Sequence, residues 1–379
     1  MKMKETRLMG FLLAAALLVA LFTGCLRQMD EALAASGKAT GQTQVKSESS
    51  AKATRTVVDL AGRKVTIPAN VTKVASLTGP SFETVIMLGA MDQVVMTGFR
   101  NASSGWAAEV CPPYAKIPVA KKATAPNIEE LVDLGVEVVL FWDAYPEVIE
   151  SLNKVGISVV VTQVNDDGID TYEQFVELKK KEIMLVGEVF GGAAVEKAKK
   201  WCRYVDKTVK YVIGRTGKLD PASRPSVYYV RGPEALSTHG GESYTRYLVD
   251  IAGGDLVNKK DRKLHYSTTM ERVMEWDPAY IFMGRVNNVE LITKDPAWAP
   301  IRAVKDGRVY VNLRGIGLTD YCTDCFLLME QIAKTLHPKL FEDLDMMKAV
   351  KSYFADFYGY KLTDKQAEYV LTFKGPDGR

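Results

Sequence analysis

The sequence predicts an α/β protein in which two lobes are joined by one long helix. Short apolar strands alternate with helical segments in the first part of the chain, and the same alternation returns after residue 224. A long amphipathic pattern separates the two parts. Strands that alternate with helices indicate a parallel sheet covered on both faces. A length of 379 residues also corresponds to about two domains.

Residues 1–25 have the form of an export signal. Basic residues precede an apolar run of about 15 residues, which is shorter than the roughly 20 needed to span a bilayer. The run ends in LFTGC, which resembles the bacterial lipobox. We therefore expect lipidation at Cys25 rather than an uncleaved membrane anchor, and an extracytoplasmic, lipid-anchored protein. Residues 26–55 are small and polar without apolar periodicity, so we expect a flexible tether.

Residues 56–170 are predicted to form the first lobe. Two β-rich runs around a turn signal, in VVDLAGRKVTIP, predict a hairpin. A strand and a helix are predicted next, in KVASL and TGPSFETVIMLGA. The same rhythm continues through QVVMTGF, NIEELVDLG, VEVVLFW, EVIESLNKVG and ISVVVTQ.

Residues 171–213 are predicted to form one long helix, because apolar residues recur every three or four positions. Gly191 and Gly192 interrupt this pattern at a cost of about 1 kcal/mol each relative to alanine, so a kink or a break is the alternative. Residues 224–340 repeat the α/β alternation and are predicted to form the second lobe. Residues 341–379 contain two further helical segments in a C-terminal extension.

The order of these elements resembles the cluster A (class III) substrate-binding proteins of ABC importers. The resemblance covers about residues 56–373, and its local patterns are DLAGRKVTIP, PNIEELVDLGVEVVLFW, TTMERVMEWDPAYIFMG and FYGYKLTDKQ. Members of this group handle ferric siderophores, haem, cobalamin and some bare metals or oxyanions. The resemblance implies two Rossmann-like lobes around a ligand cleft, joined by a backbone helix. It also implies a partnership with an ABC permease dimer and its ATPase subunits.

Two carboxylates are implied as contacts for the permease. In the group that this chain resembles, a glutamate near the start of a helix in each lobe reaches permease arginines. The matching positions are Glu129, or its neighbour Glu130, and Glu271. An exposed carboxylate at a helix start is favoured by the helix dipole and can pair with arginine. The alternative is that these glutamates only stabilise their own helices.

Four arginines follow four predicted strands. Ligands of open α/β sheets bind outside the carboxyl ends of strands, and guanidinium groups suit carboxylates, phosphate or oxyanions. We expect two or more of them to line the cleft, although an ordinary surface position is the alternative for any single one. The four are Arg100, Arg231, Arg285 and Arg314.

Aromatic residues occupy the same positions. Trp142 and Tyr145 follow VEVVLF, and Tyr321 lies in the loop LRGIGLTDYC, with Trp106 and Tyr114 as further candidates. Flat rings of this kind pack well against a macrocycle or the catecholate groups of a siderophore. Alternatively, Trp142 covers only the local core.

His239 lies in the Gly-rich loop ALSTHGGES, before a predicted helix and close to Tyr244. It could ligate haem iron or hydrogen-bond a ligand, whereas the alternative is a structural histidine. The pair Cys322 and Cys325 has the spacing of a redox or zinc pair. Without a following histidine or a second pair, we expect a local disulfide or free thiols and no metal site.

Composition and motifs exclude several other functions. A formal net charge of +3 is too small to indicate nucleic-acid binding. The sequence contains no G-x-S-x-G, H-E-x-x-H, P-loop or dinucleotide-binding motif, so we expect no enzyme and no cofactor. We expect a monomeric binding protein for a chelated metal such as Fe(III), foremost a ferric siderophore. Haem, cobalamin and molybdate-type oxyanions remain alternative ligands, and a chelatase or a non-transport receptor remains an alternative of another class.

Overall fold

The protein is represented by a computed structural model that describes residues 53–99, 105–164 and 168–379. The predictions for Cys25, the signal segment, residues 26–52 of the tether and Arg100 lie outside these residues. The described chain opens with the antiparallel hairpin of β1 (Thr54–Val58) and β2 (Lys64–Pro68), which confirms the sequence prediction. Asp59 and Arg63 close its turn through an ion pair of 2.6 Å between Oδ2 and Nη2.

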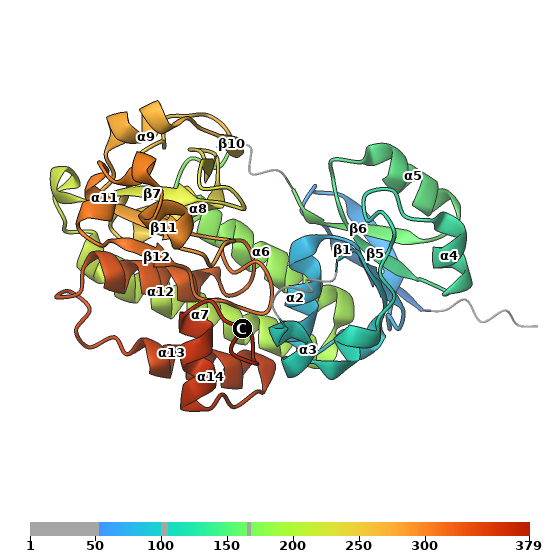
Figure 1. The fold of residues 1–379 in the computed structure, drawn as a ribbon. Helices are drawn as coiled ribbons and strands as arrows, with labels where there is room; N and C mark the ends of the chain where they lie inside the picture. Colours follow the sequence, from blue (N-terminus) through green and yellow to red (C-terminus); the bar gives the residue numbers. More distant parts are fainter. Residues whose placement is uncertain (1–52, 100–104, 165–167) are drawn as a thin grey trace, which may run out of the picture. The chain divides into compact units, whose positions relative to one another are not determined.

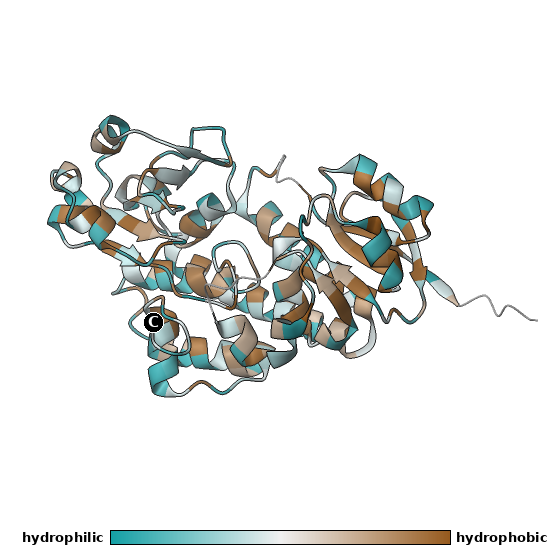
Figure 2. Ribbon diagram, turned by 45° about the vertical axis from the view of Figure 1, so that its right-hand side comes forward, coloured by the Kyte–Doolittle hydropathy of each residue, from teal (hydrophilic) through white to brown (hydrophobic). Residues whose placement is uncertain are grey.

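The first lobe contains a parallel four-stranded sheet in the order β4-β3-β5-β6. Figure 1 labels two of its strands, β5 and β6. Its strands follow near-continuous apolar runs, which is typical of strands buried on both faces. Figure 2 shows these strands as hydrophobic and the covering helices as mixed. The strands are β3 (Val74–Ser76), β4 (Val94–Thr97), β5 (Val138–Trp142) and β6 (Ser158–Gln163). The helices are α2 (Gly79–Leu88), α3 (Trp106–Val110), α4 (Ile128–Asp133) and α5 (Pro146–Lys154).

Two helices, not one, connect the lobes. Helix α6 (Tyr172–Phe190) ends at Gly191, where φ is 74°, and α7 (Gly192–Thr216) then folds back along it. An ion pair of 2.8 Å between Lys180 and Asp206 shows that the two helices are antiparallel. The prediction of a single long helix is therefore wrong, and the alternative break at the glycines is correct. Both helices pack against α2 of the first lobe and α8 of the second.

The second lobe contains a mixed sheet in the order β10-β8-β7-β11-β12, with β9 beside β7. The parallel strands are β7 (Ser226–Val230), β9 (Asp255–Leu256), β11 (Tyr280–Met283) and β12 (Val309–Val311). The antiparallel strands are β8 (Ser237–His239) and β10 (His265–Ser267). The helices are α8 (Tyr244–Ile251), α9 (Met270–Trp276), α10 (Glu290–Thr293), α11 (Arg302–Lys305) and α12 (Cys325–Leu336). Residues 312–324, here called the 312–324 loop, connect β12 to α12.

The C-terminal extension returns to the first lobe. It consists of α13 (Met346–Tyr353), the short π-helical turn η5 (Phe354–Tyr358) and α14 (Asp364–Leu371). Trp106 of α3 donates from Nε1 to the Lys374 carbonyl at 2.9 Å, and its ring lies 5.6 Å from the Phe354 ring. The extension therefore completes the packing of the first lobe.

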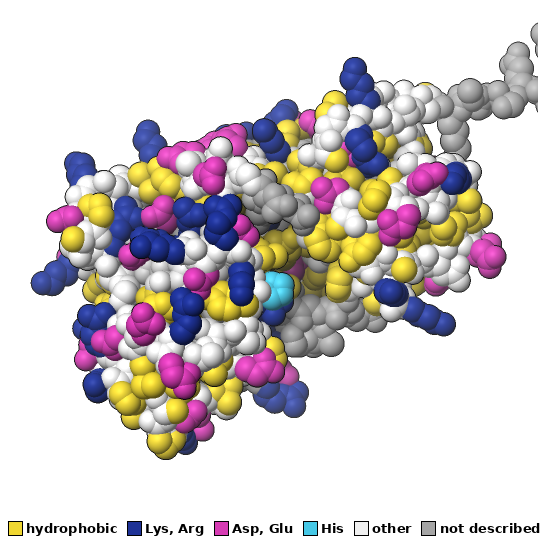
Figure 3. All heavy atoms as spheres, turned by 90° about the horizontal axis from the view of Figure 1, so that it is seen from above, with side chains coloured by type: hydrophobic (Ala, Val, Ile, Leu, Met, Phe, Trp, Pro, Cys, Tyr) yellow, Lys and Arg dark blue, Asp and Glu magenta, His cyan; other side chains and the backbone are white. Residues whose placement is uncertain are grey.

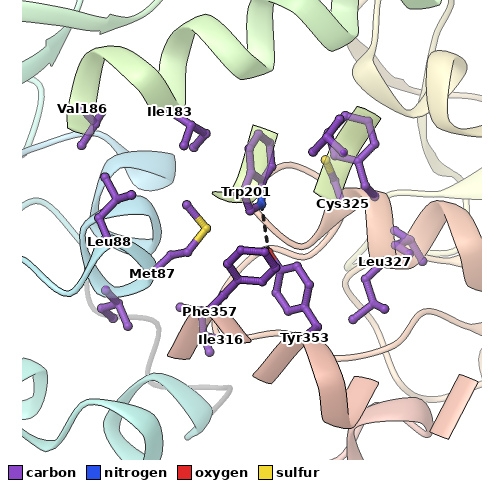
Figure 4. Packing of buried hydrophobic residues seen from close by; sticks show 14 of the residues in the cluster. Met87, Leu88, Ile183, Val186, Trp201, Ile316, Cys325, Leu327, Tyr353 and Phe357 are labelled. Carbon is purple, nitrogen blue, oxygen red and sulfur yellow. Dashed lines mark hydrogen bonds between the residues drawn. The ribbon is translucent and has the colours of Figure 1, made fainter. Parts of the chain in front are cut away.

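One hydrophobic core extends across the lobes. Figure 4 shows Met87 of α2, Ile183 of α6 and Phe357 of η5 within a single buried cluster. Trp201 of α7 donates from Nε1 to the Tyr353 hydroxyl at 3.2 Å within this cluster. A shared core of this kind ties the lobes to the connecting helices and allows little independent movement.

Candidate ligand-binding site

A cavity of about 380 Å³ lies at the carboxyl ends of the first-lobe strands. Its position agrees with the general rule for ligand sites in open α/β sheets. Most of its wall is apolar or aromatic, and the 312–324 loop closes one side with Leu318 and Tyr321. The apolar residues of the first lobe include Leu77, Pro80, Phe82, Phe99, Phe141 and Trp142.

Trp142 and Tyr145 both line this cavity, as the sequence predicts. Their rings meet edge to face, with centroids 5.5 Å apart. The buried indole N–H of Trp142 has no hydrogen-bond partner among the residues described. An unpaired buried donor is costly, so this N–H is suited to a water or ligand acceptor.

A polar network in the second lobe connects Arg285 to the cavity. Arg285 Nη2 donates to the Tyr244 hydroxyl at 2.6 Å and pairs with Asp320 Oδ1 at 3.3 Å. The Tyr244 ring lies 4.8 Å from the ring of Tyr321, which lines the cavity. Tyr229 holds Asp320 by donating from its hydroxyl to Oδ2 at 3.0 Å. The network therefore places a guanidinium and phenol groups behind one wall of the cavity.

Arg231 lies in the same positive region. Its side chain is half-buried after β7, and Nη1 donates weakly to the Gly232 carbonyl at 3.5 Å. Burial, and then the charges of Arg231 and Arg285, lower the pKa of His265. Arg231 makes no ion pair within residues 53–99, 105–164 and 168–379. Figure 3 shows a group of Lys and Arg side chains on the second lobe and hydrophobic side chains across the first.

His239 is a structural residue, contrary to its predicted role as a metal or ligand contact. It is 1% exposed, and its ring stacks on Tyr229 with centroids 5.4 Å apart. Nδ1 lies 2.7 Å from Thr245 Oγ1, and Nε2 lies 3.4 Å from the Tyr244 hydroxyl. Burial lowers the pKa of His239 to about 3, so the imidazole is neutral. Since both ring nitrogens have partners, neither is available to a metal.

Arg314 also departs from the prediction. Its guanidinium lies 5.3 Å from the Phe373 ring, and its backbone N–H donates to the Val370 carbonyl at 2.7 Å. The C-terminal extension covers this strand end, so Arg314 packs there and does not line the cavity. Of the two further aromatic candidates, Trp106 and Tyr114 are both buried in the core.

Glu83 lines the cavity but was not predicted from the sequence. It is 1% exposed, and its Oε1 accepts from the Leu318 backbone N–H at 2.9 Å. Burial, and then the nearby Asp324, raise the pKa of Glu83 to about 8. A single acid within the apolar helix sequence FETVIML is the signal that could have identified it.

The cysteine pair Cys322 and Cys325 consists of free, buried thiols, the second of the two predicted states. Burial raises the pKa of both thiols, which keeps them protonated. Within the described ranges, no group of three or more His, Cys, Asp or Glu side chains is placed to hold a metal ion.

Glu129 and Glu271 are exposed in the first turns of α4 and α9. The Asn127 side chain caps α4 by accepting from the Glu129 N–H at 3.0 Å, and Thr269 caps α9. Hydrogen bonds to its own backbone N–H and to Thr269 lower the pKa of Glu271. Both side chains are therefore presented to solvent.

These features define a two-lobed ligand-binding protein with its cavity at strand ends. The chain belongs to the periplasmic binding protein family, whose pattern matches residues 74–312. It is an ABC importer substrate-binding protein of this family, which comprises extracytoplasmic transport proteins and not enzymes. No helix among the described residues is both long and apolar enough to cross a membrane.

The relatives differ in ligand. The chain is 28% identical over 335 residues to the molybdate-binding protein MolA of Haemophilus influenzae, covering 82% of this chain and 92% of MolA. It is 21% identical over 197 residues to an iron-uptake system-binding protein of Bacillus subtilis, covering 49% and 58% of the two chains. A solved structure of MolA bound to molybdate has a TM-score of 0.74 and 25% identity, covering 82% of this chain and 99% of that one.

Proposed function

We propose that this protein captures an anionic metal complex with an organic, partly aromatic ligand, foremost a ferric siderophore, and delivers it to an ABC permease. The observation that supports this proposal is the asymmetry of the cavity. One wall is aromatic, with Phe99, Trp142 and Tyr145, and the other leads to Arg285 through Tyr321 and Tyr244. Rings contact the organic part of such a complex, and the guanidinium balances its negative charge.

The size of the cavity supports an organic ligand. About 380 Å³ lies within the usual range of roughly 300–1,000 Å³ for small-molecule sites. A bare tetrahedral oxyanion would leave most of the aromatic wall without contact. Haem and cobalamin also have flat or apolar surfaces that could pack against the aromatic wall. They therefore remain alternative ligands within the same proposal.

Molybdate is the second candidate ligand, because MolA is a molybdate-binding protein with 28% identity to this chain. A bare oxyanion would depend on the second-lobe side of the site, where the charges of Arg231 and Arg285 lie behind the cavity wall and add to the effect of burial in lowering the pKa of His265. The two candidates therefore depend on different walls, and substitutions can separate them.

The test is a titration of the purified protein with ferric tris-catecholate, ferric hydroxamate, haemin, cobalamin and molybdate, followed by calorimetry and tryptophan fluorescence. We expect one ferric complex to bind with a Kd of about 1 µM or tighter, near −8 kcal/mol. Trp142→Ala should weaken that binding by about tenfold or more, while leaving any molybdate binding unchanged. Tyr310→Ala, at an exposed ring on β12, is the matched control.

If only molybdate binds, and Trp142→Ala does not change its affinity, the protein would be an oxyanion-binding protein and the proposal of a ferric complex would be wrong. No binding by any ligand of the panel would count against the cavity as the site.

We further propose that Cys25 carries a lipid and that the residues between it and β1 tether the protein to the membrane surface, as the LFTGC motif supports. The predicted tether is shorter by two residues, because Thr54 and Arg55 belong to β1. A Cys25→Ala variant should leave the membrane fraction of expressing cells. Its retention there, at the level of the unchanged protein, would contradict the anchor.

A further inference from the structure

The 312–324 loop joins the ligand cavity to the polar network of the second lobe. Leu318 and Tyr321 line the cavity. Between them, Asp320 pairs with Arg285 and accepts from Tyr229. Whatever fixes the position of this loop therefore also fixes the Tyr321 ring in the cavity wall and the Arg285 guanidinium behind it.

Glu83 fixes the loop from the opposite lobe. It projects from α2, and its Oε1 accepts from the Leu318 N–H at 2.9 Å. Gly317 lies so close that a Cβ atom at this position would overlap the Glu83 carboxyl group. Gly315 has the same relation to the carboxyl group of Asp324. Glycine at both positions thus allows the loop to pack directly on two buried acids.

The two acids have no cationic partner. Neither Glu83 nor Asp324 forms an ion pair among the described residues, although both are fully buried. Lys179 is close to the loop, but it pairs with Glu182 at 3.0 Å. Uncompensated buried carboxylates are costly, so the pair is stable only when it carries protons. Burial raises the pKa of Asp324 to about 7, in line with the raised pKa of Glu83.

The other titratable groups around the pair do not replace a cation. From the loop, the charge of Asp320 raises the pKa of Glu83, whereas the protonated Cys322 thiol donates a hydrogen bond to it and lowers that pKa. From the C-terminal extension, Tyr353 and Tyr358 face the acids. Burial raises the pKa of both hydroxyl groups above the ordinary value for tyrosine. Ionisation of Glu83 would therefore place a buried negative charge beside Asp324 and Asp320, while the nearby Lys179 is paired with Glu182.

We propose that Glu83 is a positioning residue of the ligand site, which holds the 312–324 loop against α2 as a neutral acid and releases the loop when it ionises. The protein would then hold its ligand tightly in neutral or mildly acidic surroundings and weakly in alkaline ones. This inference rests on the proposed function insofar as it concerns ligand affinity, but the movement of the loop can be measured without any ligand.

The first experiment measures amide hydrogen exchange of residues 312–324 without ligand, in the unchanged protein and in Glu83→Gln, each at pH 6 and pH 9. Glutamine keeps the acceptor for the Leu318 N–H but cannot ionise. We expect equal exchange at pH 6 and exchange at least about fivefold faster in the unchanged protein at pH 9. Comparison at the same pH removes the intrinsic effect of pH on exchange.

The second experiment measures the Kd of ferric tris-catecholate for the same proteins from pH 6 to pH 9. We expect the affinity of the unchanged protein to fall at least about tenfold more than that of Glu83→Gln. Asp324→Asn should move the loss of affinity to higher pH, because the like charge next to Glu83 is removed. Glu147→Gln, an exposed first-turn acid of α5, should follow the unchanged protein.

The outcomes separate the two proposals. Failure of the ferric complex to bind at pH 6, together with the expected exchange difference, would contradict the proposed ligand and leave the positioning role of Glu83 intact. Equal exchange of the 312–324 loop at pH 9 in both proteins would overturn that role, whatever ligand binds.

Discussion

Asp320 determines how Arg285 is held behind the wall of the ligand cavity. The carboxylate is 1% exposed and accepts from both Tyr229 and Arg285. It thereby orients the guanidinium toward the Tyr244 hydroxyl, which lies beside Tyr321. A single buried acid thus organises the polar wall of the site.

Replacing this acid should affect stability and affinity together. We expect Asp320→Asn to lower the free energy of unfolding by about 2 kcal/mol, the usual value of hydrogen bonds to a charged group. It should also weaken binding of an anionic ligand, because Arg285 loses the partner that orients it. Chemical denaturation and calorimetry measure the two effects.

Asp343→Asn is the matched control, since Asp343 pairs with Arg215 at 2.9 Å at the exposed surface. It should change the free energy of unfolding by less than about 1 kcal/mol. Equal effects of the two substitutions would show that the Asp320 network has no special role.

Individual site residues could be predicted only where their position relative to the end of a predicted strand is enough to place them in the cavity. Trp142 is the last residue of β5 and Tyr145 lies three positions after it, so their place at a strand end is visible in the sequence. The burial of His239 depends on Tyr229, a residue of another strand, and no local pattern reports that stacking. The prediction that Arg314 lines the cleft was wrong for a similar reason. The C-terminal extension, more than 50 residues later in the chain, covers this arginine.

At the scale of elements, periodicity predicted the hairpin and the strands of the first lobe but not the turn between α6 and α7. Both helices bury an apolar stripe of the same period, so the pattern continues through the glycines. The break is visible only in the backbone conformation, because Gly191 has φ of 74° and ψ of −172°, which ends the helix. The close approach of Gly187 to Ala198 then allows the helices to pack together.

The helix starts of α4 and α9 carry the proposed contact with the permease. We expect the double variant Glu129→Arg and Glu271→Arg to lose uptake in cells while keeping its affinity for ligand, because the reversed charges would repel the arginines that the family resemblance implies on the permease. Uptake of the labelled ferric complex and calorimetry measure the two properties.

Glu147 and Glu290 provide the control pair, since both are exposed acids in the first turns of α5 and α10. Their double reversal should leave uptake near its original level. Normal uptake by the Glu129 and Glu271 variant would favour a surface receptor that does not deliver to a permease.

At the scale of the whole molecule, buried acids make stability depend on pH. Burial raises the pKa of Glu83 to about 8, and the pKa of Asp324 and of Glu330 to about 7. The folded state therefore binds more protons than the unfolded state, and the stability from these groups is lost as pH rises toward 8. Below pH 6.5 the neutral His239 opposes this trend, because burial lowers its pKa.

We therefore expect Tm to fall by several degrees between pH 6.5 and pH 8. Scanning calorimetry of the ligand-free protein at constant ionic strength measures this change. Glu83→Gln should flatten the slope, whereas a Tm that rises across the same range would contradict the protonated state of these acids.

The contact between Trp106 and Lys374 has a consequence for how the chain is made. The two residues are 268 positions apart, so the first lobe cannot complete its core until the last part of the chain is available. Contacts of such long sequence separation slow folding, because a large loop must close before they form. A nascent chain therefore stays incompletely folded until its synthesis is almost finished, which is the state that a protein bound for export needs to keep.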